Sequence, residues 1–142
     1  MCERRLLTAL LGRAVPPASI HAGVAPGFRA VPFDDRPWPV LVRAPGRAAE
    51  GLVILGLSPF ERDLLDAWEG ADYRPAPLPV MIGEELHEAE AYLPSHPLRA
   101  TGPDLPDWHF AVWAEQHAER AIAAARHEGE TLRAKLIALR PH

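Results

Sequence analysis

The chain has 142 residues, of which 48% are hydrophobic and 24% are charged. This length fits one domain with a core of its own, and the composition is that of an ordinary globular protein rather than a disordered chain. No stretch approaches the roughly 18 to 20 uninterrupted apolar residues that a membrane-spanning helix needs. We therefore expect a single domain over residues 1–142 that does not enter a membrane.

The net charge of −4 is unevenly distributed. Residues 1–60 hold seven Arg and four acidic residues, whereas residues 61–142 hold eight basic and fifteen acidic residues. Neither part supplies the strongly basic face that nucleic-acid binding requires. The only cysteine, Cys2, cannot form an intramolecular disulfide, which favours a reducing compartment, the cytoplasm.

Apolar spacing predicts a helix and then a series of strands in the first part of the chain. Four leucines lie at helical spacing within residues 3–12, and Gly12 follows as a stop signal. The turn Ala44-Pro45-Gly46 is expected to connect two strands as a hairpin. The predicted strands, each bounded by Pro or Gly, are Ser19–Ala25, Phe28–Phe33, Pro39–Arg43 and Glu50–Leu57.

A capping box gives the clearest local signal. Ser58 is the N-cap, Pro59 takes the first helical position, and Glu61 follows three residues after the cap. Leucines and a tryptophan then form an apolar face, and Gly70 ends the helix. We predict a helix over about residues 58 to 69.

The last third of the chain predicts two strands and two helices, which makes the fold class α+β. The strands are Tyr73–Ile82, which three prolines confine to an edge or irregular position, and His87–Leu93. After a loop that lasts to about Pro106, apolar spacing predicts a helix from Trp108 to about Arg126 and another over Thr131–Leu139. Both helices are expected to pack on the sheet.

Glu69 is the strongest candidate for acid–base chemistry. It lies beside Trp68 in the last turn of the predicted helix, where the negative end of the helix dipole and an apolar neighbour both disfavour the ionised carboxyl. We expect a raised pKa, which suits a group that takes up and returns a proton near neutrality. A solvated carboxylate without a function is the alternative at this point.

The other candidate motifs in the sequence do not indicate a catalytic or metal site. His109, His117 and His127 are separated by eight and ten residues, which does not give the i, i+4 pair of a helical metal site. The phosphate-loop, dinucleotide and serine-hydrolase motifs are absent from the sequence. Neither a metal nor an organic cofactor is expected, and the sequence is silent on the oligomeric state.

A set of short motifs in a fixed order resembles the γ-glutamylcyclotransferase-like family, also called AIG2-like. The resemblance covers about residues 6–93. The motifs are Leu10-Leu11-Gly12-Arg13, Gly27-Phe28-Arg29-Ala30-Val31-Pro32, Arg36-Pro37-Trp38-Pro39-Val40-Leu41-Val42, Glu50-Gly51, Gly56-Leu57-Ser58 and Leu65-Asp66-Ala67-Trp68-Glu69-Gly70-Ala71-Asp72-Tyr73.

The resemblance implies a fold, a substrate class and site residues. The fold is a small mixed β-barrel over residues 6–93 with surrounding helices, on which the C-terminal helices of residues 105–140 pack. The implied reaction cyclises a small γ-glutamyl amide to 5-oxoproline with release of an amine, and Glu69 is the general acid and base. Gly70, Tyr73 and Trp38 are the implied substrate-binding residues.

The start of the sequence departs from the family pattern. Family members begin with a strand that ends in a Y-G-[ST]-L/N loop, whereas Met1-Cys2-Glu3-Arg4 leads directly into the first predicted helix. We expect this strand and loop to be missing, either because the start was placed late or because the site was lost. A γ-glutamyl-amine acyltransferase and a noncatalytic binding or interaction domain therefore stay open as alternatives.

Overall fold

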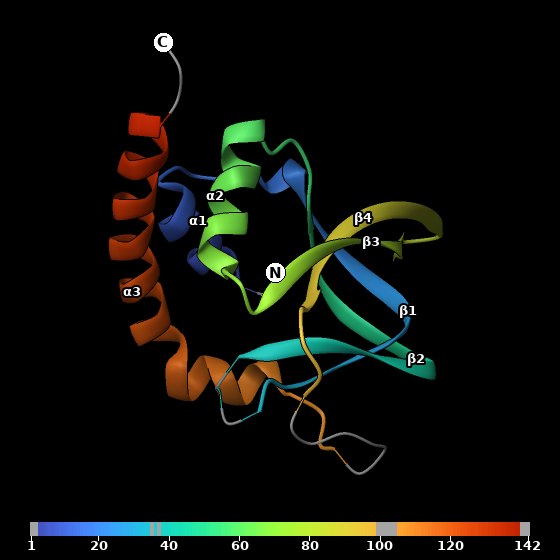
Figure 1. Cartoon of the computed structure of the whole chain (residues 1–142). Coiled ribbons are helices and arrows are strands. Elements are labelled where there is room, and N and C mark those ends of the chain that lie inside the picture. The colour runs from blue at the N-terminus through green and yellow to red at the C-terminus, as the bar shows by residue number, and fades with distance from the viewer. Residues whose placement is uncertain (1–2, 35, 37, 99–104, 140–142) are drawn as a thin grey trace.

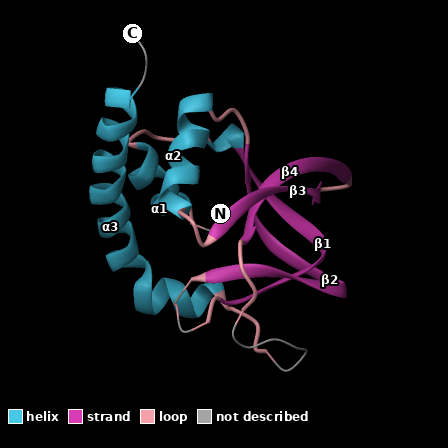
Figure 2. Ribbon diagram, viewed as in Figure 1, coloured by secondary structure: helices cyan, strands magenta, loops and turns pink. Residues whose placement is uncertain are grey.

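The computed structural model describes residues 3–34, 36, 38–98 and 105–139. Figures 1 and 2 show the helices gathered on one side of a strongly twisted sheet. Cys2 and the middle of the loop predicted before Pro106 lie outside the described residues. The elements in chain order are α1 (Arg4–Leu11), a 3-10 turn (Pro17–Ser19), β1 (Ile20–Pro32), β2 (Pro39–Ile54), α2 (Pro59–Glu69), β3 (Tyr73–Ile82), β4 (Glu85–Pro94) and α3 (Phe110–Leu139).

The four strands form one sheet in the order β2-β1-β3-β4, and every neighbouring pair is antiparallel. The predicted α+β class is confirmed. The resemblance implied a mixed, closed barrel, but the sheet that the described residues form is antiparallel and is not closed. Both β2 and β4 are edge strands of this sheet.

The first two strands are longer than predicted, because two predicted breaks are bends. The prediction of a hairpin at Ala44-Pro45-Gly46 is wrong, since this segment lies within β2 and both of its flanks pair with β1. Residues 44–47 of β2 lie opposite Gly27, where the register shifts. Gly27 and Gly46 have φ angles of 79° and 80°, which lets both strands bend without ending.

The prolines of β3 shape its pairing. Val24 of β1 and Met81 of β3 form the one pair recorded between these strands within the described residues, whereas β3 pairs with β4 along its whole length. Pro75, Pro77 and Pro79 alternate along β3, so their missing N–H groups all fall on one side of the strand. Of the two predicted positions for this strand, the edge position is wrong, since β3 lies between β1 and β4, while its short pairing with β1 is irregular.

Helix α2 is fixed at its start, as the sequence predicts. The Ser58 side chain accepts a hydrogen bond from the Glu61 backbone N–H at 3.1 Å, and the Glu61 carboxylate accepts one from the Ser58 N–H at 3.1 Å. Arg13, which follows α1, also donates to both Glu61 oxygens. This pairing holds the pKa of Glu61 below its usual range and joins the end of α1 to the start of α2.

The C-terminal segment is one helix of 30 residues, which corrects the prediction of two. Gly129 interrupts the apolar pattern of the sequence, but the helix continues through it. Its lack of a side chain allows α3 to pack closely against α1. A Cβ atom at this position would lie 2.5 Å from the carbonyl oxygen of Leu10 in α1. The Arg133 guanidinium donates a hydrogen bond to the same carbonyl, so α3 is attached to the C-terminal end of α1.

The helices and the sheet share a core that surrounds α2. Trp68 of α2 packs against two clusters of buried side chains, one formed mainly by α1 and α3 and one formed by α1 and α2. The first cluster consists of Leu6, Ala9, Trp113, Ala118, Ile122 and Ala125. The second consists of Leu7, Leu10, Leu11, Val15, Leu64 and Leu65. The end of α2 therefore depends on the position of α3.

Replacing Gly129 by alanine tests the close approach of α3 to α1. Alanine normally stabilises a helix interior by about 1 kcal/mol relative to glycine. At this site the added methyl group meets the Leu10 carbonyl, so we expect Gly129→Ala to lower the free energy of unfolding by about 1 to 3 kcal/mol in urea denaturation. Ala124→Gly, at an exposed position of the same helix, measures propensity alone. A Gly129→Ala protein more stable than wild type contradicts the packing role.

Candidate functional site

Glu69 is the last residue of α2 and lies where the helix meets the sheet. The charge of its carboxylate acts on the hydroxyl groups of Tyr73, the first residue of β3, and Tyr92 of β4. Asp66 precedes it by three residues and lies on the same side of α2. Two acidic and two phenolic side chains are therefore gathered at this end of the helix.

Burial gives Glu69 an unusual proton affinity. It raises the pKa of the carboxyl from its ordinary 4.5 to about 7, and the negative charge of Asp66 adds to this rise. No described side chain donates a hydrogen bond to the Glu69 carboxylate or forms an ion pair with it. The raised pKa that the sequence predicted is confirmed, and the carboxyl can exchange a proton near neutral pH.

Asp66 and Tyr92 form a pair beside Glu69. The Tyr92 hydroxyl donates a hydrogen bond to Oδ1 of Asp66. Burial raises the pKa of Tyr92 well above its usual range, and the Asp66 carboxylate raises it further, so Tyr92 holds its proton. The bond fixes the Asp66 charge between α2 and β4, within range of Glu69.

The residues that the resemblance implied for substrate binding gather around Tyr73. Its hydroxyl donates to the Pro39 carbonyl at 3.3 Å, and the Trp38 side chain is within hydrogen-bonding reach of it. Trp38 is 45% exposed, so its ring is available for contact. Gly70 caps α2 with a φ of 74°, and, apart from its two chain neighbours, no described residue comes within 4 Å of a Cβ placed there.

A charged cluster borders this group. The Arg36 guanidinium lies 4.4 Å from the Phe33 ring centroid and 2.8 Å from Oδ2 of Asp72. Nε2 of His96 lies 3.2 Å from the other oxygen of Asp72. These bonds hold the pKa of Asp72 below its usual range, with the His96 contact the larger cause. The Arg36 charge also acts on the Tyr73 hydroxyl, so a positive group lies at the border of the site.

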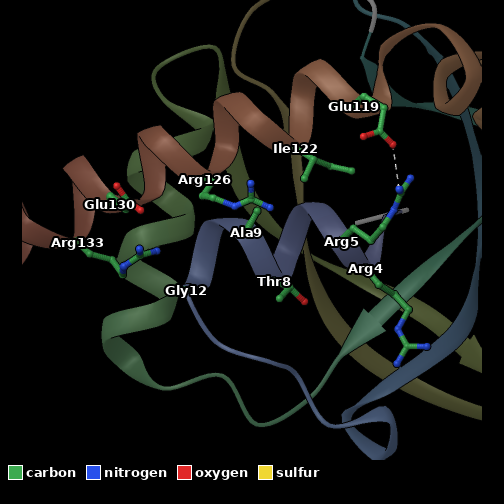
Figure 3. A pocket seen from close by; sticks show the side chains of 10 residues that line it. All are labelled: Arg4, Arg5, Thr8, Ala9, Gly12, Glu119, Ile122, Arg126, Glu130 and Arg133. Carbon is green, nitrogen blue, oxygen red and sulfur yellow. Dashed lines mark hydrogen bonds and ion pairs between the residues drawn. The ribbon is translucent and has the colours of Figure 1, made fainter.

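An open groove of about 640 Å³ lies between α1 and α3, away from Glu69. Figure 3 shows Arg4 and Arg5 of α1 on one side and Arg126 and Arg133 of α3 on the other. Several of these charges are already engaged, because Arg5 pairs with Glu119 at 3.2 Å and Arg133 donates to a backbone carbonyl. None of the predicted site residues lines this groove.

Sequence reasoning missed the roles of Asp66 and Tyr92. Asp66 stands in the motif that identified Glu69, and its spacing of three residues on a helix is a signal that could have been used. Tyr92 lies in a different strand, and no spacing in the sequence relates it to α2. Only the packing of β4 against α2 brings its hydroxyl to Asp66.

The fold and the site define a class: an α+β protein with a proton-exchanging carboxyl at a helix end. The sequence profile of the family described as gamma-glutamyl cyclotransferase, AIG2-like, matches residues 3–111. The chain belongs to this family, as the resemblance indicated. No protein of curated function matches the chain.

Two solved structures share the fold. One is the solution structure of At3g28950.1 from Arabidopsis thaliana, with a TM-score of 0.62, 24% identity, and coverage of 88% of this chain and 74% of that one. The other is the solution structure of At5g39720.1 from the same plant, with a TM-score of 0.61, 22% identity, and coverage of 86% and 80%. No helix within the described ranges is both long and apolar enough to cross a bilayer.

The raised pKa of Glu69 predicts a pH-dependent cost to folding. The folded pKa of about 7 lies above the ordinary 4.5, so the contribution of Glu69 to stability is greatest below pH 4.5 and is lost as the pH rises from about 4.5 to about 7. Glu69→Gln does not titrate. The difference in free energy of unfolding between Glu69→Gln and wild type should therefore shift in favour of the variant by on the order of 3 kcal/mol between pH 5 and pH 8.

Urea denaturation at a series of pH values measures this gain. Glu130→Gln removes an exposed carboxyl from α3, and its difference from wild type should stay constant over the same range. If the difference for Glu69→Gln were equally constant, the Glu69 carboxyl would be a solvated group with an ordinary pKa.

Removing the charge of Asp66 should lower the pKa of Glu69. Asp66 raises that pKa through its negative charge, and asparagine keeps the size of the side chain without the charge. NMR titration of the ¹³C-labelled Glu69 carboxyl in Asp66→Asn measures the shift. Asp63→Asn, at an exposed position of α2, is the control. A Glu69 pKa that stays at its wild-type value in Asp66→Asn would remove Asp66 from the site.

Proposed function

We propose that the protein cyclises a γ-glutamyl amide to 5-oxoproline and releases an amine, with Glu69 as the general acid and base. The observation that carries the proposal is the partly buried Glu69 carboxyl, whose pKa is raised to about 7. Membership of the gamma-glutamyl cyclotransferase, AIG2-like family over residues 3–111 supports the substrate class. The single cysteine of the sequence favours the cytoplasm as its location.

The proposed reaction needs one proton carrier. The α-amine of the glutamyl group attacks its own γ-carbonyl carbon, a C–N bond forms to close a five-membered ring, and the original amide C–N bond breaks. Because nucleophile and carbonyl belong to one molecule, much of the entropic cost of bringing them together is already met. Ionised Glu69 takes a proton from the α-ammonium and then gives it to the departing nitrogen. The ring nitrogen loses its second excess proton, which ends on water or on the released amine as that amine becomes an ammonium ion. The reaction written in this way needs no oxidant, metal or second substrate.

The neighbours of Glu69 have separate roles in the proposal. Trp38 presents an exposed ring, and no residue other than its chain neighbours crowds Gly70, so both can lie against the substrate. Burial raises the pKa of the Tyr73 phenol above its usual range, so its hydroxyl stays protonated; the proton is donated to the Pro39 carbonyl, which leaves the hydroxyl oxygen to accept a hydrogen bond from the substrate. Asp66 sustains the proton affinity that Glu69 needs at neutral pH.

The test is 5-oxoproline release by the full chain. We expect wild type to release 5-oxoproline from at least one member of a panel of γ-glutamyl amino acids, γ-glutamyl dipeptides and γ-glutamyl amines. Glu69→Gln should fold and lose at least about 100-fold in kcat/KM, since it cannot carry the proton. Mass spectrometry of the products measures both. Glu130→Gln should keep wild-type activity.

The panel also separates the remaining alternatives. Release from γ-glutamyl amines alone would assign a narrower amine-releasing activity. A wild-type protein that binds γ-glutamyl compounds and releases no 5-oxoproline would be a noncatalytic binding domain. An active Glu69→Gln protein would exclude Glu69 from the mechanism.

A further inference from the structure

We infer that α3 is a working part of the site, because Glu128 holds Trp68 and thereby positions Glu69. The inference rests on the proposed function of Glu69. It assigns Glu128 and Trp68 a positioning role, since neither is placed to touch the reacting atoms. The family profile matches residues 3–111, whereas α3 spans Phe110–Leu139, so almost all of the positioning element lies beyond the matched residues.

The contact that carries the inference is a hydrogen bond between helices. Nε1 of Trp68 donates to Oε2 of Glu128 at 2.9 Å. A carboxylate acceptor makes this a charge-assisted bond, which is stronger than a bond between neutral groups. Trp68 immediately precedes Glu69 and is the penultimate residue of α2, so the bond acts on the turn that presents the carboxyl.

This turn needs support from outside α2. The last turn of a helix lacks partners for its final carbonyl groups and frays readily. The Gly70 N–H donates to the Asp66 carbonyl and the Tyr73 N–H to the Gly70 carbonyl, so the backbone beyond the helix is bonded, but these bonds do not fix the position of the Trp68 side chain. The Trp68 ring packs against the buried clusters of α1, α2 and α3, and the bond to Glu128 fixes how far and at what angle the ring enters.

Helix α3 can serve as a fixed point because its own position is set next to Glu128. Gly129 lies against the Leu10 carbonyl, and the Arg133 guanidinium donates to the same oxygen. Figure 1 shows α3 running beside α1 and α2 on the side of the molecule opposite the sheet. A shift of α3 along its axis would break these contacts with α1 together with the bond to Trp68.

Glu128 acts through position rather than charge. Within the described residues the negative charge that raises the pKa of Glu69 is that of Asp66. The groups that face Glu69 are Asp66 from α2, Tyr73 from β3 and Tyr92 from β4. Neutralising Glu128 while keeping its acceptor should therefore leave the site intact, whereas removing the acceptor should not.

The experiment compares four variants of the full chain. Glu128→Ala removes the acceptor and Trp68→Phe removes the donor, so we expect each to lower kcat for 5-oxoproline release by roughly tenfold, with a smaller change in KM. Glu128→Gln keeps an acceptor oxygen and should retain at least half of the wild-type kcat. Glu130→Ala, two residues away on α3, is the matched control. The double variant Trp68→Phe/Glu128→Ala should lose no more than the worse single variant.

A second measurement does not depend on activity. Fraying of the last turn of α2 would expose the Glu69 carboxyl to water, so its pKa in Glu128→Ala should fall from about 7 towards 4.5, as measured by NMR of the ¹³C-labelled carboxyl. The same fall is expected in Trp68→Phe, and none in Glu128→Gln or Glu130→Ala. Thermal melting confirms that each variant is folded at the temperature of the assay.

The two measurements separate the outcomes. A wild type that releases no 5-oxoproline while the pKa of Glu69 falls in Glu128→Ala would overturn the proposed function and leave the positioning role of α3 standing. A Glu128→Ala protein with wild-type kcat and an unchanged Glu69 pKa would overturn the positioning role. Loss of kcat in Glu128→Gln equal to that in Glu128→Ala would overturn it as well, because charge and not the hydrogen bond would then matter.

Discussion

The structure is organised around a carboxyl group that is partly shielded from water at the end of a helix. Water favours the ionised form of such a group, and no described side chain replaces that water with a hydrogen bond to Glu69. The cost appears as a pKa near 7 instead of 4.5. A site of this kind persists only if the surrounding packing prevents the helix end from moving into solvent.

Both ends of α2 are restrained, by different means. The capping box and the Arg13–Glu61 pair fix its start and join it to α1. Its end is held by the bond from the Gly70 N–H to the Asp66 carbonyl and by the Tyr92–Asp66 bond. Trp68 adds a further restraint, because it lies between two buried clusters and donates to Glu128 of α3. The long C-terminal helix is thus connected to the site through packing, even though it lies beyond the part of the chain that the family profile covers.

Local signals in the sequence predicted α1, α2 and the raised pKa of Glu69, because each depends on residues close together in the chain. Prediction failed where tertiary contacts decide. Gly129 breaks the apolar pattern and looks like a helix end, but its lack of a side chain is needed for the contact with α1. The Ala44-Pro45-Gly46 segment has the composition of a hairpin turn, yet it forms a bend within β2 because β1 bends beside it at Gly27.

The site shows the same division. Glu69, Gly70 and Tyr73 could be found because they belong to one short motif, and Trp38 because it belongs to another. The pairing of Tyr92 with Asp66 and of Glu128 with Trp68 joins residues 26 and 60 positions apart. Such pairs follow from how β4 and α3 pack on α2, and one sequence contains no periodicity that reveals them.

The pH dependence of kcat/KM for 5-oxoproline release tests the central claim about Glu69 most directly. A base that must be ionised in the free enzyme gives activity that rises with pH and levels off above its pKa. We expect the midpoint of this rise near pH 7, at the value that NMR titration gives for the Glu69 carboxyl. A rate that is constant from pH 5 to pH 8, or a midpoint near 4.5, would contradict the role of a partly buried Glu69 as the proton carrier.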